Sequence, residues 1–186
     1  MAQPLTPAFD PRAGTEAILY LAAAINVPTL HAVLKLRYMA DKMHLGRYGQ
    51  VASGDSYVAM EFGPVASHTY HLMQAARGDE SVFIDDEYRA IAHEAFSIAE
   101  DGISIIAKRP PHLDYIADSD RACLDEAIAK YGCLNFNQRV LLSHGKAWEE
   151  AWRSCTQDQR VAQMPTVSIA RELDNADEVL EHLHID

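Results

Sequence analysis

The sequence is poor in cysteine and contains no long hydrophobic run. Its three cysteines, Cys123, Cys133 and Cys155, are widely spaced and form no Cys-x-x-Cys pair, so they indicate neither a disulfide framework nor a zinc site. We expect them to be small buried hydrophobic side chains, as free cysteines often are. The longest apolar run, residues 17–25, has nine residues, whereas a helix that crosses a bilayer needs about 20. We therefore expect no membrane-spanning helix.

Basic residues are also scarce in this chain. It has 16 Lys and Arg residues against 27 Asp and Glu residues, which gives a net charge of −11. Binding to nucleic acid or to anionic lipid requires a basic surface, so this charge argues against both and leaves cationic proteins open as partners. The first residues also lack the basic patch and the apolar stretch of a secretory signal peptide. We therefore expect a cytoplasmic protein that binds neither DNA nor a membrane directly.

The common catalytic motifs are missing as well, including Gly-x-Ser-x-Gly, the P-loop and Gly-x-Gly-x-x-Gly. Ser143 and His144 are adjacent, and on a helix their side chains would point about 100° apart, so they do not form a nucleophile–base pair. His68 and His71 could share a helix face and bind a metal ion, but Glu61 is the only third ligand nearby in the sequence. We expect no catalytic residue, no metal site and no cofactor.

The composition is that of an ordinary globular protein, with 48% hydrophobic and 23% charged residues. A chain of 186 residues is most simply one domain. We expect a lead-in over residues 1–8, a domain over residues 9–170, and an acidic tail with a helix over residues 171–186.

Apolar residues recur with the helical period in most of the chain, and they predict a mainly α fold. The expected helices cover residues 10–25, 29–45, 67–77, 85–99, 119–131, 137–153 and 175–183. The first of them is apolar nearly all round, which is typical of a central helix. Strand character is limited to residues 50–62 and 103–107, and we expect these two segments to form a small two- or three-stranded antiparallel sheet.

Six side chains on the apolar helix faces are expected to lie in the core. They are Leu19, Ala22, Leu34, Tyr38, Leu124 and Leu141.

Three motifs occur in a fixed order along the chain. Residues 34–41 read Leu-Lys-Leu-Arg-Tyr-Met-Ala-Asp, and they are followed by the turn Gly54-Asp55, the aromatic-rich segment 57–62 and Gly63-Pro64. The third motif is a late helix start, Asp118-x-Asp120, followed by a leucine, a Tyr-Gly pair, and a Ser-His pair before a tryptophan. These are Leu124, Tyr131-Gly132, Ser143-His144 and Trp148. In this order, over about residues 9–170, the sequence resembles the SocA-like, or Panacea, antitoxin domain, although Asp118 stands where that pattern has Ser.

The resemblance implies a non-enzymatic protein that neutralises a toxin, usually encoded beside it, by direct protein contact. One mode that the family suggests is delivery of the toxin to a ClpXP-type protease. It also marks a set of motif residues that are expected to be structural: Leu34, Tyr38, Asp41, Gly54, Asp55, Gly63, Pro64, His144 and Trp148. Two alternatives stay open, an interaction protein of a phage or mobile element without a toxin, and an uncharacterised enzyme.

One stretch of this acidic chain is basic. Residues 29–50 contain four basic residues against one acidic residue, and aromatic residues follow closely. Because aromatic and Arg side chains dominate interface energies, we expect a toxin to dock on exposed side chains here. The expected toxin-binding residues are Lys35, Arg37, Lys42, Arg47, Tyr48, Tyr57 and Phe62.

Overall fold

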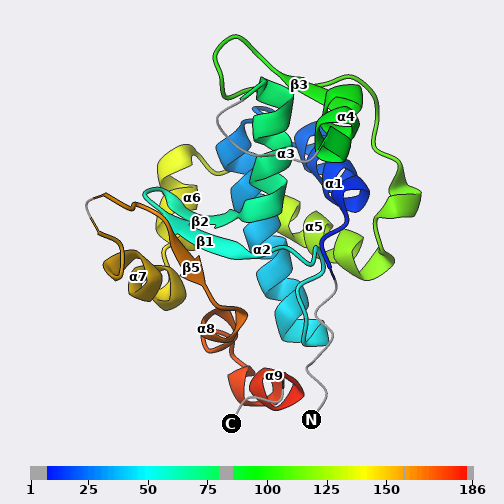
Figure 1. The fold of residues 1–186 in the computed structure, drawn as a ribbon. Coiled ribbons are helices and arrows are strands. Elements are labelled where there is room, and N and C mark those ends of the chain that lie inside the picture. The colour runs from blue at the N-terminus through cyan, green and yellow to red at the C-terminus, as the bar shows by residue number, and fades with distance from the viewer. Residues whose placement is uncertain (1–7, 80–85, 157, 184–186) are drawn as a thin grey trace.

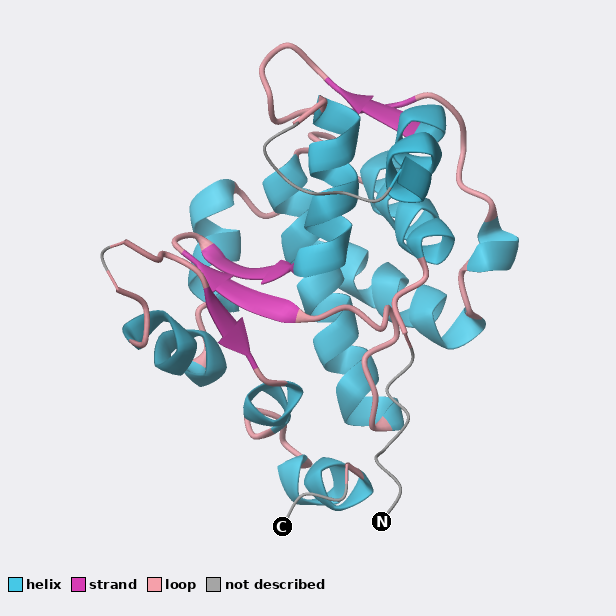
Figure 2. Cartoon of the chain, in the orientation of Figure 1, coloured by secondary structure: helices cyan, strands magenta, loops and turns pink. Residues whose placement is uncertain are grey.

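Helices make up most of the computed structural model, which describes residues 8–79, 86–156 and 158–183. The described residues form α1 (Pro11–Ala24), α2 (Leu30–Tyr48), α3 (Ser67–Arg77), α4 (Asp86–Ala95), α5 (Asp118–Tyr131), α6 (Phe136–Ser143), α7 (Lys146–Arg153), α8 (Thr166–Ala170) and α9 (Ala176–His182). A short 3-10 turn, η1 (Leu113–Tyr115), precedes α5. Together with two small antiparallel sheets, these helices confirm the mainly α fold (Figure 2).

The long helix α2 is the axis of the molecule, and α1, α3 and α5 pack around it (Figure 1). It begins where the Thr29 hydroxyl accepts a hydrogen bond from the Ala32 amide at 3.2 Å, as expected for an N-cap. It ends at Gly49, which adopts the left-handed conformation at φ +69° and returns its N–H to the Leu45 carbonyl. Most of its side chains are buried, charged ones included, so α2 rather than the more apolar α1 is the central helix.

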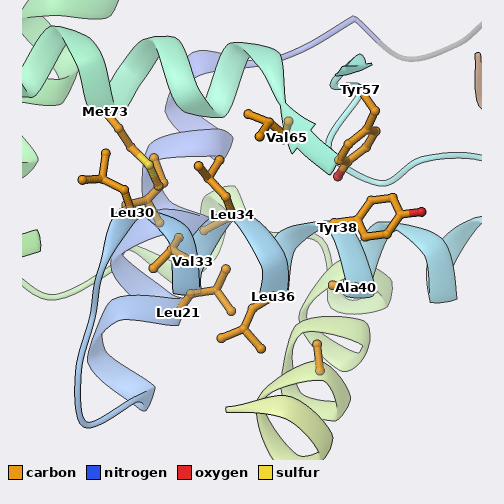
Figure 3. Packing of buried hydrophobic residues seen from close by; sticks show 14 of the residues in the cluster. Leu21, Leu30, Val33, Leu34, Leu36, Tyr38, Ala40, Tyr57, Val65 and Met73 are labelled. Atoms are coloured by element: carbon orange, nitrogen blue, oxygen red, sulfur yellow. The ribbon is translucent and has the colours of Figure 1, made fainter. Parts of the chain in front are cut away.

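The core lies where α2 meets its neighbours. Figure 3 shows Leu30 and Leu34 of α2 on the side of Met73 in α3, and Val33 on the side of Leu21 in α1. Five of the six side chains expected in the core are at most 7% exposed, which confirms Leu19, Ala22, Leu34, Tyr38 and Leu124.

The expectation for Leu141 is wrong, because its side chain is 77% exposed. The helix predicted over residues 137–153 is in fact two helices, α6 and α7, separated at His144 and Gly145. The carboxylate of Glu172 lies at this break and accepts a hydrogen bond from the Ala147 amide at 2.5 Å, so it caps the start of α7. A Cβ at Gly145 would approach this carboxylate to 2.5 Å, so a larger residue there would require the end of the Glu172 side chain to shift.

The expected pairing of residues 50–62 with residues 103–107 is also wrong. Strand β1 (Tyr57–Met60) turns back on β2 (Gly63–Ala66) and also pairs with β5 (Ala162–Met164), in the order β2-β1-β5. Gly63 at φ +103° allows the tight turn of this hairpin.

The strand β4 (Ile105–Ala107) pairs instead with β3 (Phe96–Ile98). The chain can form β3 because α4 ends at Ala95, earlier than the helix expected over residues 85–99. The expected start of that helix at Asp85 lies outside the described residues.

The described part of the acidic tail packs against α2. The Asn175 side-chain amide donates to the Gly46 carbonyl at 2.9 Å, and Val179 of α9 is buried. These contacts place α8 and α9 beside the C-terminal end of α2, as Figure 1 also shows.

Candidate functional site

The first of two polar regions on α2 is a closed network around Arg37. The guanidinium donates to Asp41 at 2.7 Å and to both carboxylate oxygens of Asp120 at 2.6 and 3.0 Å. Asp41 also accepts from the Ser53 and Tyr57 hydroxyls, each at 2.6 Å. Burial alone would lower the pKa of Arg37, but the two carboxylates reverse this effect and raise it. The network joins α2 to α5, to β1 and to the loop before β1.

A second carboxylate, that of Asp55, holds the start of α3. It accepts hydrogen bonds from the amides of His68 and Thr69 at 2.8 and 2.9 Å, and from the Thr69 hydroxyl at 2.8 Å. The residue before α3, Ala66, has no capping side chain, so Asp55 acts as the cap from another part of the chain. Gly54 at φ +64° forms the turn that brings this carboxylate into place.

Three residues expected on an exposed docking surface are instead buried. Lys35 and Arg37 are 2% exposed and Tyr57 is 3% exposed, so the expectation that these side chains are exposed is wrong. Neighbouring elements cover the part of α2 that carries Lys35 and Arg37, so their charge does not bring these side chains to the solvent. Tyr48 and Phe62 are 48% and 52% exposed.

The basic charge of this stretch is largely cancelled within the molecule. Lys42 forms an ion pair with Glu172 of the tail, and Arg47 forms one with Glu126 of α5. Both partners are more than 75 residues away in the sequence, which is why the sequence alone gave a basic patch. Among the described residues, Lys35 forms no ion pair, and its Nζ donates to the Pro64 carbonyl at 2.6 Å. Burial lowers the pKa of Lys35 from 10.5 to about 7.

Two further basic side chains, His31 and His144, lie near Lys35, and Arg139 lies near His31. Together we call them the basic cluster: His31, Lys35, Arg139 and His144. Burial, with Lys35 and Arg139 nearby, lowers the pKa of His31 from 6.5 to about 4. Burial also lowers the pKa of Arg139, and burial and Lys35 lower that of His144. In the part of the chain that the structure describes, no member of the basic cluster is within ion-pair distance of a carboxylate.

Gly63 occupies the centre of this arrangement. A Cβ at this position would lie 2.6 Å from the Ser143 hydroxyl, 3.0 Å from Lys35 Nζ and 3.1 Å from the His144 ring. The hairpin backbone therefore approaches α2 and α6 at Gly63 so closely that a side chain there would clash. The φ of Gly63, +103°, is a second reason for glycine at this position.

The basic cluster lies beneath two adjoining hollows. One, of about 380 Å³, is lined by Lys35, Phe62 and Gly63 among others, and the other, of about 610 Å³, by Val27 and Arg139 among others. The two share three lining residues, His31, Ile103 and Phe136.

Four large apolar side chains surround these hollows and are exposed to solvent. We call them the apolar face: Val27 (66%), Phe62 (52%), Ile103 (55%) and Phe136 (43%). The Phe136 ring lies 4.2 Å from the His31 ring and 5.4 Å from the Phe62 ring, measured between centroids. In Figure 1, α6 accordingly lies beside the turn of the β1–β2 hairpin. An exposed patch of this kind next to a hollow is typical of a protein-binding surface.

The sequence reasoning missed most of these residues. His31 precedes Lys35 by one helical turn, so the i, i+4 spacing could have indicated that the two share a face. No sequence signal relates α2 to Ile103, Phe136 or Arg139, because those residues reach the site through the tertiary fold.

His144, Trp148 and Trp152 form an aromatic stack, with ring centroids 3.5 and 5.9 Å apart. His144 lies at the break before α7. The Trp148 indole N–H donates to the Met60 carbonyl at 2.9 Å, so this stack attaches α7 to the end of β1.

The described residues include no group of three or more His, Cys, Asp or Glu side chains that could hold a metal ion. His68 and His71 have ring centroids 6.1 Å apart. Of the helices described, none is both long enough and apolar enough to span a bilayer.

Comparison with known proteins gives one result. The model of the antitoxin SocA-like, Panacea domain matches residues 33–149, which is more than half of the chain and extends from α2 into α7. No curated protein and no solved structure matches significantly.

Proposed function

This chain belongs to the family of SocA-like antitoxins with a Panacea domain, and on that premise we propose that it neutralises a protein toxin by binding it directly. Membership of the family supports a non-enzymatic role related to toxin–antitoxin systems, with a protein as the partner. The toxin is expected to be encoded beside this protein. The net charge of −11 gives no support to direct binding of DNA.

The single observation that carries the docking site is the apolar face above the two hollows. Phe62 and Phe136 are both exposed, and they contact each other across the gap between the hairpin and α6. Aromatic side chains beside a pocket are the groups that most often dominate binding energy at an interface. They sit on short elements held by the Trp148 stack and the Gly63 turn, so the surface is fixed before a partner arrives.

The proposed surface differs from the one expected from the sequence. Of the expected residues it keeps Phe62 at the surface, and it places Lys35 beneath the surface rather than on it. The remaining basic residues of α2 are engaged with carboxylates of α5 and of the tail.

The test is neutralisation in cells that express the neighbouring open reading frame. We expect that frame to arrest growth alone and to be harmless when this protein is co-expressed. Phe62→Ser combined with Phe136→Ser should abolish neutralisation, because it removes the aromatic pair without touching the core. A matched control is Tyr115→Ser, since Tyr115 is similarly exposed at 47% and lines a different hollow.

The melting temperature of each variant shows whether it is folded. Neutralisation by a folded double variant at the wild-type level would place the docking surface elsewhere. A neighbouring frame that does not arrest growth would contradict the antitoxin role itself.

Binding can neutralise a toxin by sequestration or by delivery to a ClpXP-type protease. The half-life of the toxin distinguishes these modes: as an adaptor, this protein shortens it in cells with the protease and not in cells without it. A half-life that this protein leaves unchanged or lengthens supports sequestration.

A further inference from the structure

The basic cluster differs from the other cations of α2 in having no ion pair among the described residues. Arg37, Lys42 and Arg47 of the same helix all pair with carboxylates. Glu61 is the one carboxylate among the described residues that line the 380 Å³ hollow, and it is exposed and directed to Arg160 at 3.5 Å. In a protein of net charge −11, a buried lysine with partly buried basic neighbours and no ion-paired carboxylate is unusual.

We propose that the basic cluster receives a carboxylate of the bound partner, an Asp or Glu side chain flanked by apolar residues, which enters the hollow that Phe62 and Phe136 line. This inference rests on the proposed function, and it adds the chemistry of the segment that the protein recognises. His31 and Arg139 meet the carboxylate at the mouth, and Lys35 provides positive charge from the floor of the hollow.

Part of the hydrogen-bond capacity of the cluster is unused. Neither ring nitrogen of His31 nor Nε2 of His144 has a partner of normal geometry, although both rings lie near the backbone of Phe62. Arg139 Nε also lacks a partner, whereas its Nη1 donates to the Leu134 carbonyl. Lys35 uses one donor on the Pro64 carbonyl, and an ammonium has three. Burial lowers the pKa of both Lys35 and His31, so the free protein does not stabilise their charged forms, and an incoming carboxylate would.

The walls of the site favour a single carboxylate within an apolar segment over a phosphate group. Much of the hollow is lined by Leu30, Leu34, Met60 and Val65, whose side chains offer no hydrogen-bond donors. Tyr70 and Arg77 also line it, and Arg77 already pairs with Asp79 at 3.3 Å. A phosphate has three acceptor oxygens and about two charges at neutral pH, and burying it needs more donors than this cluster presents.

The first experiment is calorimetric titration of the toxin from the neighbouring frame into four proteins. They are the wild type, Lys35→Met, Phe62→Ser and Arg12→Gln. Truncating one partner of a buried charge pair at an interface typically weakens binding by at least about 30-fold, and we expect this for Lys35→Met. Arg12→Gln removes an exposed cation at the start of α1 and should leave the affinity unchanged.

The outcomes separate the two proposals. If Phe62→Ser weakens binding and a folded Lys35→Met does not, the docking face stands and the carboxylate inference is overturned. If the wild type does not bind the toxin at all, the proposed function fails. Should Lys35→Met not fold, His31→Gln takes its place, because His31 is only partly buried.

A second experiment tests the site without the toxin. The probes are the blocked peptides acetyl-Phe-Asp-Leu-amide and acetyl-Phe-Asn-Leu-amide. Each is titrated into the wild type, and binding is monitored by the amide NMR signals of the protein. We expect the Asp peptide alone to shift the signals of His31 and Gly63, and Lys35→Met to remove the effect. Equal shifts with the Asn peptide, or with inorganic phosphate at the same concentration, would overturn the inference.

Discussion

Lys35 and Arg37 lie two residues apart on one helix, and both are 2% exposed, yet the fold treats them in opposite ways. Side chains two positions apart on a helix point about 200° from each other, so they enter different regions. Arg37 meets two carboxylates, whereas Lys35 meets a backbone carbonyl and no carboxylate among the described residues. A buried charge without a counter-charge costs stability, and such groups tend to serve binding. The comparison therefore separates a side of α2 that holds the fold together from the side on which we propose that a partner binds.

Removing the Arg37 guanidinium should cause the largest loss of unfolding free energy. Arg37→Met leaves Asp41 and Asp120 buried without their cation, and removing one member of a buried ion pair typically costs about 3–5 kcal/mol of unfolding free energy. Urea denaturation at neutral pH measures the loss. A loss below about 1 kcal/mol would mean that water replaces the guanidinium and that the network is not closed.

At neutral pH, Lys35→Met should raise the unfolding free energy, whereas Arg37→Met lowers it. Because burial lowers the pKa of Lys35 to about 7, the folded state binds fewer protons at this group than the unfolded state does between about pH 7 and pH 10. The stability of the wild type relative to Lys35→Met should therefore rise with pH, by about 2–3 kcal/mol between pH 6 and pH 9. His144 acts in the same direction, since it loses the repulsion of Lys35 in the variant.

Denaturation of both proteins across this pH range measures the difference, and alkaline titration of other groups cancels between them. A pH-independent difference would show that Lys35 keeps its charge in the folded protein and is compensated by a group not recognised above.

Asp55→Ala should cause an intermediate loss of unfolding free energy. The substitution removes the carboxylate that accepts from two amides and a hydroxyl at the start of α3, and the loss of such a cap costs about 1–2 kcal/mol. Asp55→Asn is the control, since it keeps an acceptor oxygen and should lose less. Equal losses for Ala and Asn would instead assign the effect to the charge at the helix start.

The sequence predicts well those features that local chemistry determines. Thr29 and Gly78 mark helix ends because a hydroxyl cap and a left-handed glycine act within one helical turn. The sequence does not predict contacts between residues that lie far apart in the chain. Asp120 lies 83 residues from Arg37, so the sequence cannot indicate that this cation is buried.

The same reason explains the candidate site and the sheet. Phe62 could be selected from the sequence as an aromatic residue next to a turn, whereas Phe136 and Arg139 could not, because only tertiary packing brings α6 to the hairpin. Likewise, β1 pairs with β5 across about 100 residues, a contact that no local pattern specifies.

Leu141→Ala should change the unfolding free energy least, because of the way α6 is oriented. Phe136 and Ser143 are seven residues apart and lie on the inner side of this short helix, against the hairpin and α2. Leu141 falls on the outer side and is 77% exposed, so its truncation should change the unfolding free energy by less than about 0.5 kcal/mol. Leu124→Ala is the matched control, because the same truncation at a fully buried leucine of α5 costs about 2–5 kcal/mol.

Neutralisation should also survive in Leu141→Ala, because Leu141 lines neither hollow of the proposed docking face. A stable Leu141→Ala variant that no longer neutralises would extend the docking surface over the outer side of α6. The partner-facing side of the comparison would then be wider than the basic cluster and the apolar face, and the carboxylate would be one contact among several around the helix.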